Sequence, residues 1–133
     1  MVMEIKCHGL ESSLRFSKPD CEGWMNTTVD LVVPSFEGSF ICAVEIGEFK
    51  AFVEALSELM KSIGKKFEVT WGNMEANIEL SFNLQRHGTL SGSYKFSPNN
   101  INTGPTLSGG FEADQTFIES WLKQAKEVVA NAS

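Results

Sequence analysis

The sequence predicts an α+β fold in which antiparallel strands form one curled sheet, or a sandwich, packed against two helices. Most of the chain alternates apolar and polar residues, which is typical of strands with one buried face. Residues 48–63 and the residues after Asp114 instead repeat apolar side chains every three to four positions, as amphipathic helices do. Because the segments between the predicted strands are short, neighbouring strands are expected to pair antiparallel.

The first half of the chain is predicted to contain four strands and one helix. Alternation predicts strands at residues 3–7, 14–16, 24–33 and 36–46. In the fourth strand Phe36 is expected on the buried face, where Gly38 leaves room for a neighbour or a bulge. A helix follows over residues 48–63, with Glu48 toward solvent and Gly64 as its C′ residue.

The second half repeats this order. Alternation predicts strands at residues 67–71, 76–84, 90–96 and 107–113. Gly72 and Asn73 are expected to turn between the first two of these strands, and Asp114 should cap the N-terminus of the final helix. The predicted order is therefore ββββαββββα. No linker divides the chain, so residues 1–133 are predicted to form a single domain.

Composition excludes several classes of protein. With 42% hydrophobic residues, ten of them Phe, the chain can bury a large core without disulfides. The three cysteines show no disulfide spacing, and neither a signal peptide nor a membrane-spanning stretch is visible, so a cytoplasmic protein is predicted. The net charge of −6 argues against nucleic acid as a partner, because phosphate binding needs clustered Lys and Arg.

No catalytic, cofactor-binding or metal site is predicted. His8 and His87 are the only histidines, no serine lies in a nucleophile motif, and Cys42 lies in an apolar strand pattern. No cysteines or histidines have the spacing of metal ligands, and no glycine-rich phosphate-binding motif is present. An enzyme would need one of the two histidines to meet a carboxylate and a cysteine in a cleft.

Strand parity instead suggests a surface for binding another protein. The candidate residues are Trp24, Asn26, Thr28 and Asp30 on one strand and Glu75, Asn77 and Glu79 on another, all expected on solvent-facing sides. An aromatic side chain in polar surroundings is typical of a protein-binding site. The alternative interpretation is that the tryptophan is covered at the end of the sheet. Whether the two strands are neighbours is not given by the sequence.

Four segments carry a resemblance to a known family. They are residues 33–40 (VPSFEGSF), 48–56 (EFKAFVEAL), 71–80 (WGNMEANIEL) and 111–117 (FEADQTF). In this order, from about residue 24 onward, the chain resembles the WapI-type bacterial immunity proteins and a neighbouring family of uncharacterised bacterial domains. The resemblance implies a small cytoplasmic protein that binds and neutralises a cognate toxin domain, with no catalytic residues. A toxin that attacks nucleic acid is expected to be basic, and an acidic inhibitor would complement its charge.

Two further interpretations stay open. The plentiful Phe side chains could line an apolar pocket between the helices and the sheet, which would make the chain a small-molecule binding module. An exposed edge strand could also pair two copies of the chain into a homodimer.

Overall fold

The computed structural model describes residues 1–98 and 104–133, and its element order confirms the predicted ββββαββββα arrangement. The first half comprises β1 (Val2–Cys7), β2 (Leu10–Phe16), β3 (Trp24–Val33), β4 (Phe36–Glu45) and α1 (Ile46–Lys61). The second half comprises β5 (Phe67–Gly72), β6 (Ile78–Leu84), β7 (Thr89–Phe96), β8 (Leu107–Asp114) and α2 (Gln115–Asn131).

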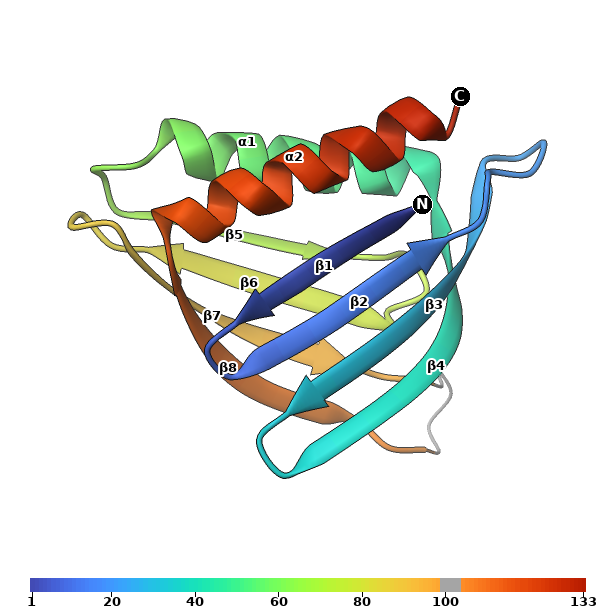
Figure 1. Cartoon of the computed structure of the whole chain (residues 1–133), viewed down its shortest axis with the longest axis horizontal. Helices are drawn as coiled ribbons and strands as arrows, with labels where there is room; N and C mark the ends of the chain where they lie inside the picture. The colour runs from blue at the N-terminus through green and yellow to red at the C-terminus, as the bar shows by residue number, and fades with distance from the viewer. Residues whose placement is uncertain (99–103) are drawn as a thin grey trace.

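Two antiparallel four-stranded sheets face each other across the core (Figure 1). Sheet A has the strand order β1-β2-β3-β4 and sheet B the order β5-β6-β7-β8, so each strand pairs with its neighbours in sequence. The two helices lie side by side over one open side of this sandwich (Figure 1). Paired backbone hydrogen bonds between His8 and Glu112, of 3.1 and 2.9 Å, join the sheets at one corner. The sandwich is therefore the correct one of the two predicted arrangements.

Helix α1 begins and ends two residues earlier than predicted. The carboxylate of Glu45 accepts a hydrogen bond from Glu48 N at 3.2 Å, so Glu45 ends β4 and caps the helix. At the other end the backbone N–H of the C-cap residue, Ser62, donates to Glu58 O at 3.0 Å. Gly64 has a left-handed φ of 94°, as a glycine near a helix end often does, but it lies one position beyond C′.

Helix α2 begins where the sequence predicts, and it covers one edge of sheet A. Asp114 is the N-cap, and its carboxylate accepts a hydrogen bond from Thr116 N at 2.9 Å. Further along, Gln124 Oε1 accepts a hydrogen bond from Glu4 N at 2.8 Å, and Gln124 Nε2 donates to Glu4 O at 3.2 Å. A side-chain amide thus satisfies backbone groups of β1 that would otherwise form an open sheet edge.

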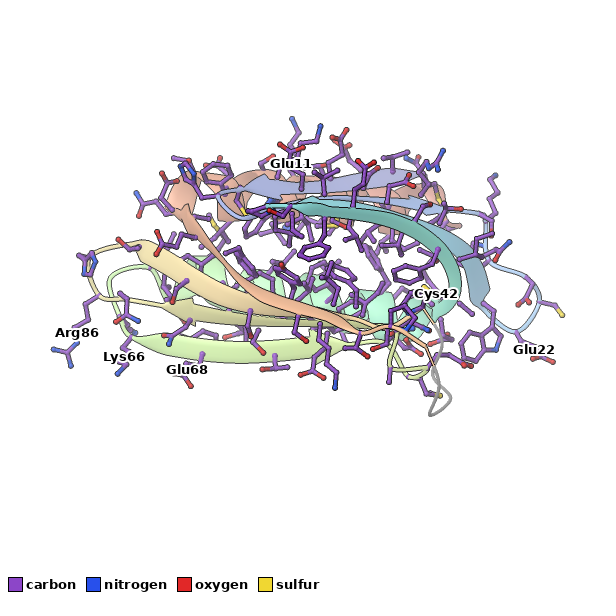
Figure 2. The ribbon with its side chains drawn as sticks, turned by 90° about the horizontal axis from the view of Figure 1, so that it is seen from below. Glu11, Glu22, Cys42, Lys66, Glu68 and Arg86 are labelled. Atoms are coloured by element: carbon purple, nitrogen blue, oxygen red, sulfur yellow. The ribbon has the colours of Figure 1, made fainter. Side chains whose placement is uncertain are left out.

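Aromatic rings fill the space between the sheets and the helices. The ring centroid of Phe82 on β6 lies 6.4 Å from Phe52 of α1 and 6.0 Å from Trp121 of α2. Side chains crowd this interior, whereas Glu11 and Glu68 project from the opposite outer faces (Figure 2). The aromatic core therefore connects both helices to sheet B.

The prediction that Phe36 lies on the buried face is wrong, since its side chain is 64% exposed. Phe36 follows the turn of the β3–β4 hairpin, which projects at the lower end of the molecule (Figure 1). The alternation of β4 points the Phe36 side chain inward, but the opposite sheet leaves most of that side chain uncovered at this end of the strand. Alternation alone cannot show where a facing sheet ends.

The turn between β5 and β6 contains a strained residue, which gives a prediction about stability. Ala76 has a φ of 58°, a left-handed conformation that L side chains adopt at a cost. We expect Ala76→Gly to raise the free energy of unfolding by about 0.5–1 kcal/mol, measured by urea unfolding. The control is Ala51→Gly at an exposed position inside α1, which should lower it by about 0.5–1 kcal/mol. Equal losses from both changes would refute the strain at Ala76.

Candidate protein-binding surface

The four candidate residues of β3 share the outer face of sheet A, as their parity predicts. They are Trp24, Asn26, Thr28 and Asp30. Asn26 is exposed, and the other three are half-buried. The Asp30 carboxylate accepts hydrogen bonds from Arg15 Nη2 at 2.9 Å and from Ser39 Oγ at 2.6 Å. Because Ser39 belongs to β4, these contacts make the outer faces of β3 and β4 one continuous surface.

The three candidate residues around β6 do not join that face, because β3 and β6 belong to different sheets. Strand β6 begins only at Ile78, so Glu75 lies in the preceding turn. The prediction that Asn77 faces solvent is wrong, since it is 5% exposed and its side-chain amide donates to Ser97 O at 2.9 Å. Glu79 is exposed on the outer face of sheet B.

The turn before β6 nevertheless brings Glu75 close to the edge of β4. Asn73 Nδ2 donates a hydrogen bond to Ala43 O at 3.2 Å, and Met74 N donates to Glu48 Oε2 at 3.1 Å. The side chain of Met74 is 74% exposed, and Glu75 is exposed beside it. The anchored turn therefore presents one apolar and one acidic side chain next to sheet A.

Burial at this turn changes the pKa values of two groups. Glu48, which we predicted toward solvent, is half-buried, and burial raises the pKa of its carboxyl group. The hydrogen bond from Met74 N opposes this rise in pKa, and the Glu45 and Glu75 carboxylates add to it. Burial likewise raises the pKa of the Cys42 thiol to about 11, and the charges of Glu48 and Glu75 contribute. A thiol with this pKa is protonated at neutral pH and is a poor nucleophile.

The raised pKa of Glu48 predicts how stability depends on pH. Because the folded-state pKa lies above the unfolded one, the folded protein binds this proton more tightly, and stability falls as pH rises through that interval. We expect Glu48→Gln to melt at a higher temperature than the unmodified protein at neutral pH, with the gap narrowing as the pH falls toward about 4.5. Thermal unfolding across this range measures the gap. Glu54→Gln, at an exposed position of the same helix, should show none; a gap that widened toward acid would contradict the assignment.

Sequence reasoning missed an apolar surface at the first half of β4. A groove of about 310 Å³ opens there between the two sheets. Its apolar lining comes from Leu31, Phe36 and Phe40 of sheet A and from Phe96, Pro98, Pro105 and Leu107 on the side of sheet B. On the outer face of the same strand, Ile41 is 65% exposed. The signal in the sequence is Gly38, which the alternation pattern interprets as room for a neighbour or a bulge.

The described part of the chain contains no group of three or more His, Cys, Asp or Glu side chains placed to hold a metal ion. His8 and His87 are exposed at separate turns, and burial raises the pKa of the Cys7 thiol to about 11. Neither of the two described helices is both long and apolar enough to cross a membrane.

Comparison with known protein families finds a match that spans nearly the whole chain. The family model described as the immunity protein WapI-like family matches residues 3–132. This range includes all four segments that carry the resemblance, and it also takes in the strands before residue 24. A search of curated proteins finds no match to the chain.

Proposed function

Since this chain belongs to the WapI-like immunity protein family, we propose that it binds a cognate bacterial toxin domain and neutralises it without catalysing a reaction. The observation that carries this proposal is the family match over residues 3–132. The partner is proposed to be a basic toxin domain, since the net charge of −6 would speed its encounter with the inhibitor. The proposed location is the cytoplasm.

The outer face of sheet A is the proposed contact surface. Trp24 supplies an aromatic anchor among polar neighbours, which is the composition of many protein-binding sites. Glu75, brought to the edge of β4 by its turn, would extend this surface with a carboxylate. Glu79 lies on the other sheet, and its part in binding stays a prediction.

The alternative, a small-molecule module, is less well supported by the packing. It requires an apolar pocket between the helices and the sheets. In that space the ring of Phe52 lies 4.6 Å from Trp71 and 5.8 Å from Phe49, and all three side chains are buried. The rings that would have lined a pocket pack against one another instead, so we prefer protein binding.

Co-expression tests the proposed function. A toxin domain encoded beside this gene is expressed in a sensitive bacterial host, with and without the protein. We expect growth to be arrested by the toxin alone and restored when the protein is present. Trp24→Ala should weaken the protection, because it removes the proposed anchor. Arrest that persists despite abundant folded protein would refute the proposal.

A further inference from the structure

We propose that the first half of β4 receives an extended segment of the toxin as an added strand, with apolar side chains in the groove and Lys or Arg side chains on the outer face. This inference rests on the proposed function and names the part of the surface that the toxin uses. Strand addition of this kind obtains affinity from main-chain hydrogen bonds and specificity from alternate side chains.

Alternate residues of β4 direct their backbone hydrogen-bonding groups away from β3. Ala43 O accepts a hydrogen bond from the side chain of Asn73, so the backbone of Ala43 points away from β3. In an antiparallel strand each residue directs its N–H and C=O to the same side, and alternate residues share that side. Glu37, Ser39 and Ile41 therefore also direct their backbone groups outward, where no described strand pairs with them.

Side chains from other elements cover the sheet edge at two positions, one on β1 and one on β4. Gln124 of α2 bonds both backbone groups of Glu4 on β1, and the side chain of Asn73 covers β4 at Ala43. Open edges are aggregation hazards, and proteins usually cover them. Among residues 1–98 and 104–133, a side chain covers the edge of β4 at Ala43, and none hydrogen-bonds the backbone of Glu37, Ser39 or Ile41, which fits an edge that a partner completes.

The apolar groove lies beside this open edge, on the inner side of β4. Side chains of an added strand alternate between the outer face and the interior, as those of β4 do. The inward ones would enter the groove of about 310 Å³ next to Gly38, where an added Cβ atom meets nothing within 4 Å. The exposed ring of Phe36 and the half-buried ring of Phe40 flank this opening. Apolar side chains of the partner would cover both.

Charge decides between a toxin segment and a second copy of the chain. Glu37 is exposed on the outer face at one end of the open edge, and Glu75 is exposed at the other. Basic side chains on the outer face of the added strand would lie beside these carboxylates. A second copy would instead bring another chain of net charge −6 to the same edge. The edge therefore suits a toxin segment in which basic and apolar side chains alternate better than it suits the same edge of a second copy of the chain.

The first test uses Ser39, because proline is tolerated at an edge position whose N–H faces solvent. The probe is a catalytically inactive form of the toxin domain encoded beside the gene. We expect Ser39→Pro to weaken binding by about tenfold or more, since it removes an outward N–H that the added strand needs. Ser39→Ala is the matched comparison: it loses the same hydroxyl bond to Asp30 but retains the N–H, so the loss of binding that proline causes beyond the loss with alanine measures the backbone hydrogen bond.

A second variant and a second measurement keep the inference testable even if the Ser39→Pro variant does not fold. Gly38→Leu enters open space, so the fold should persist while the groove is filled, and binding should again fall by about tenfold. Amide-resolved hydrogen exchange should slow at Ser39 and Ile41 when the toxin domain binds. Normal binding by both variants, or unchanged exchange at these amides in a protective complex, would overturn the inference and leave the proposed function intact. Absence of any toxin binding would overturn both, and edge-to-edge dimers in sedimentation would assign the edge to a second copy.

Discussion

Phe82→Ala is expected to lower the free energy of unfolding by about 3–5 kcal/mol. The Phe82 ring contacts Phe52 of α1, Trp121 of α2 and Phe111 of β8, at centroid distances of 6.4, 6.0 and 5.8 Å. Removing it leaves a cavity where both helices and sheet B meet, and close-packed neighbours can only partly fill such a space. Urea unfolding at neutral pH measures the loss.

Phe36→Ala provides the matched control for this change. The same side-chain atoms are removed, but from a position that is 64% exposed, so stability should change by no more than about 0.5 kcal/mol. Similar losses from the two substitutions would mean that the aromatic cluster is not the centre of the core.

Asn73→Ala is expected to cost about 2–4 kcal/mol of stability, because it leaves several buried polar groups without partners. Asn73 is 5% exposed, and its Oδ1 accepts hydrogen bonds from Asn77 N and Ile78 N, both at 2.9 Å. Its Nδ2 donates to Ala43 O and to Asn77 Oδ1, both at 3.2 Å. One side chain therefore fixes the β5–β6 turn and attaches it to sheet A.

Asn26→Ala, on the exposed outer face of β3, should change stability by no more than about 0.5 kcal/mol in the same assay. Hydrogen exchange adds a local measurement, since loss of Asn73 should speed exchange at Ile78 N before global unfolding. A cost below about 1 kcal/mol for Asn73→Ala would show that water replaces these bonds.

The sequence predicts most elements because local signals define them. Alternation and the break at Pro34 place β3 at Trp24–Val33, and Asp114 marks the start of α2 as its N-cap. The predicted start of helix α1 is two residues too late, because Glu45 continues the strand pattern in the sequence. In the structure the Glu45 carboxylate caps the helix. Such a cap is visible only once the chain turns.

Long-range packing explains what the sequence could not predict. Within each sheet the described strands pair only with strands next to them in sequence, so a curled sheet and a sandwich have the same alternation pattern. Asn77 continues the polar parity of β6, yet Asn73 and Ser97 bury it through contacts that only the folded sandwich creates. The open edge of β4 was likewise hidden, because no local signal shows which backbone groups of a strand lack a partner.

The most direct test of the account is a titration of toxin activity in vitro with the purified protein. Binding without catalysis predicts that inhibition increases linearly with added protein and is complete at about one equivalent. The toxin should be chemically unchanged, and it should be active again once it is separated from the denatured complex and refolded. Complete inhibition by a small fraction of an equivalent, together with a lasting covalent change in the toxin, would show that the protein is an enzyme and would contradict the account.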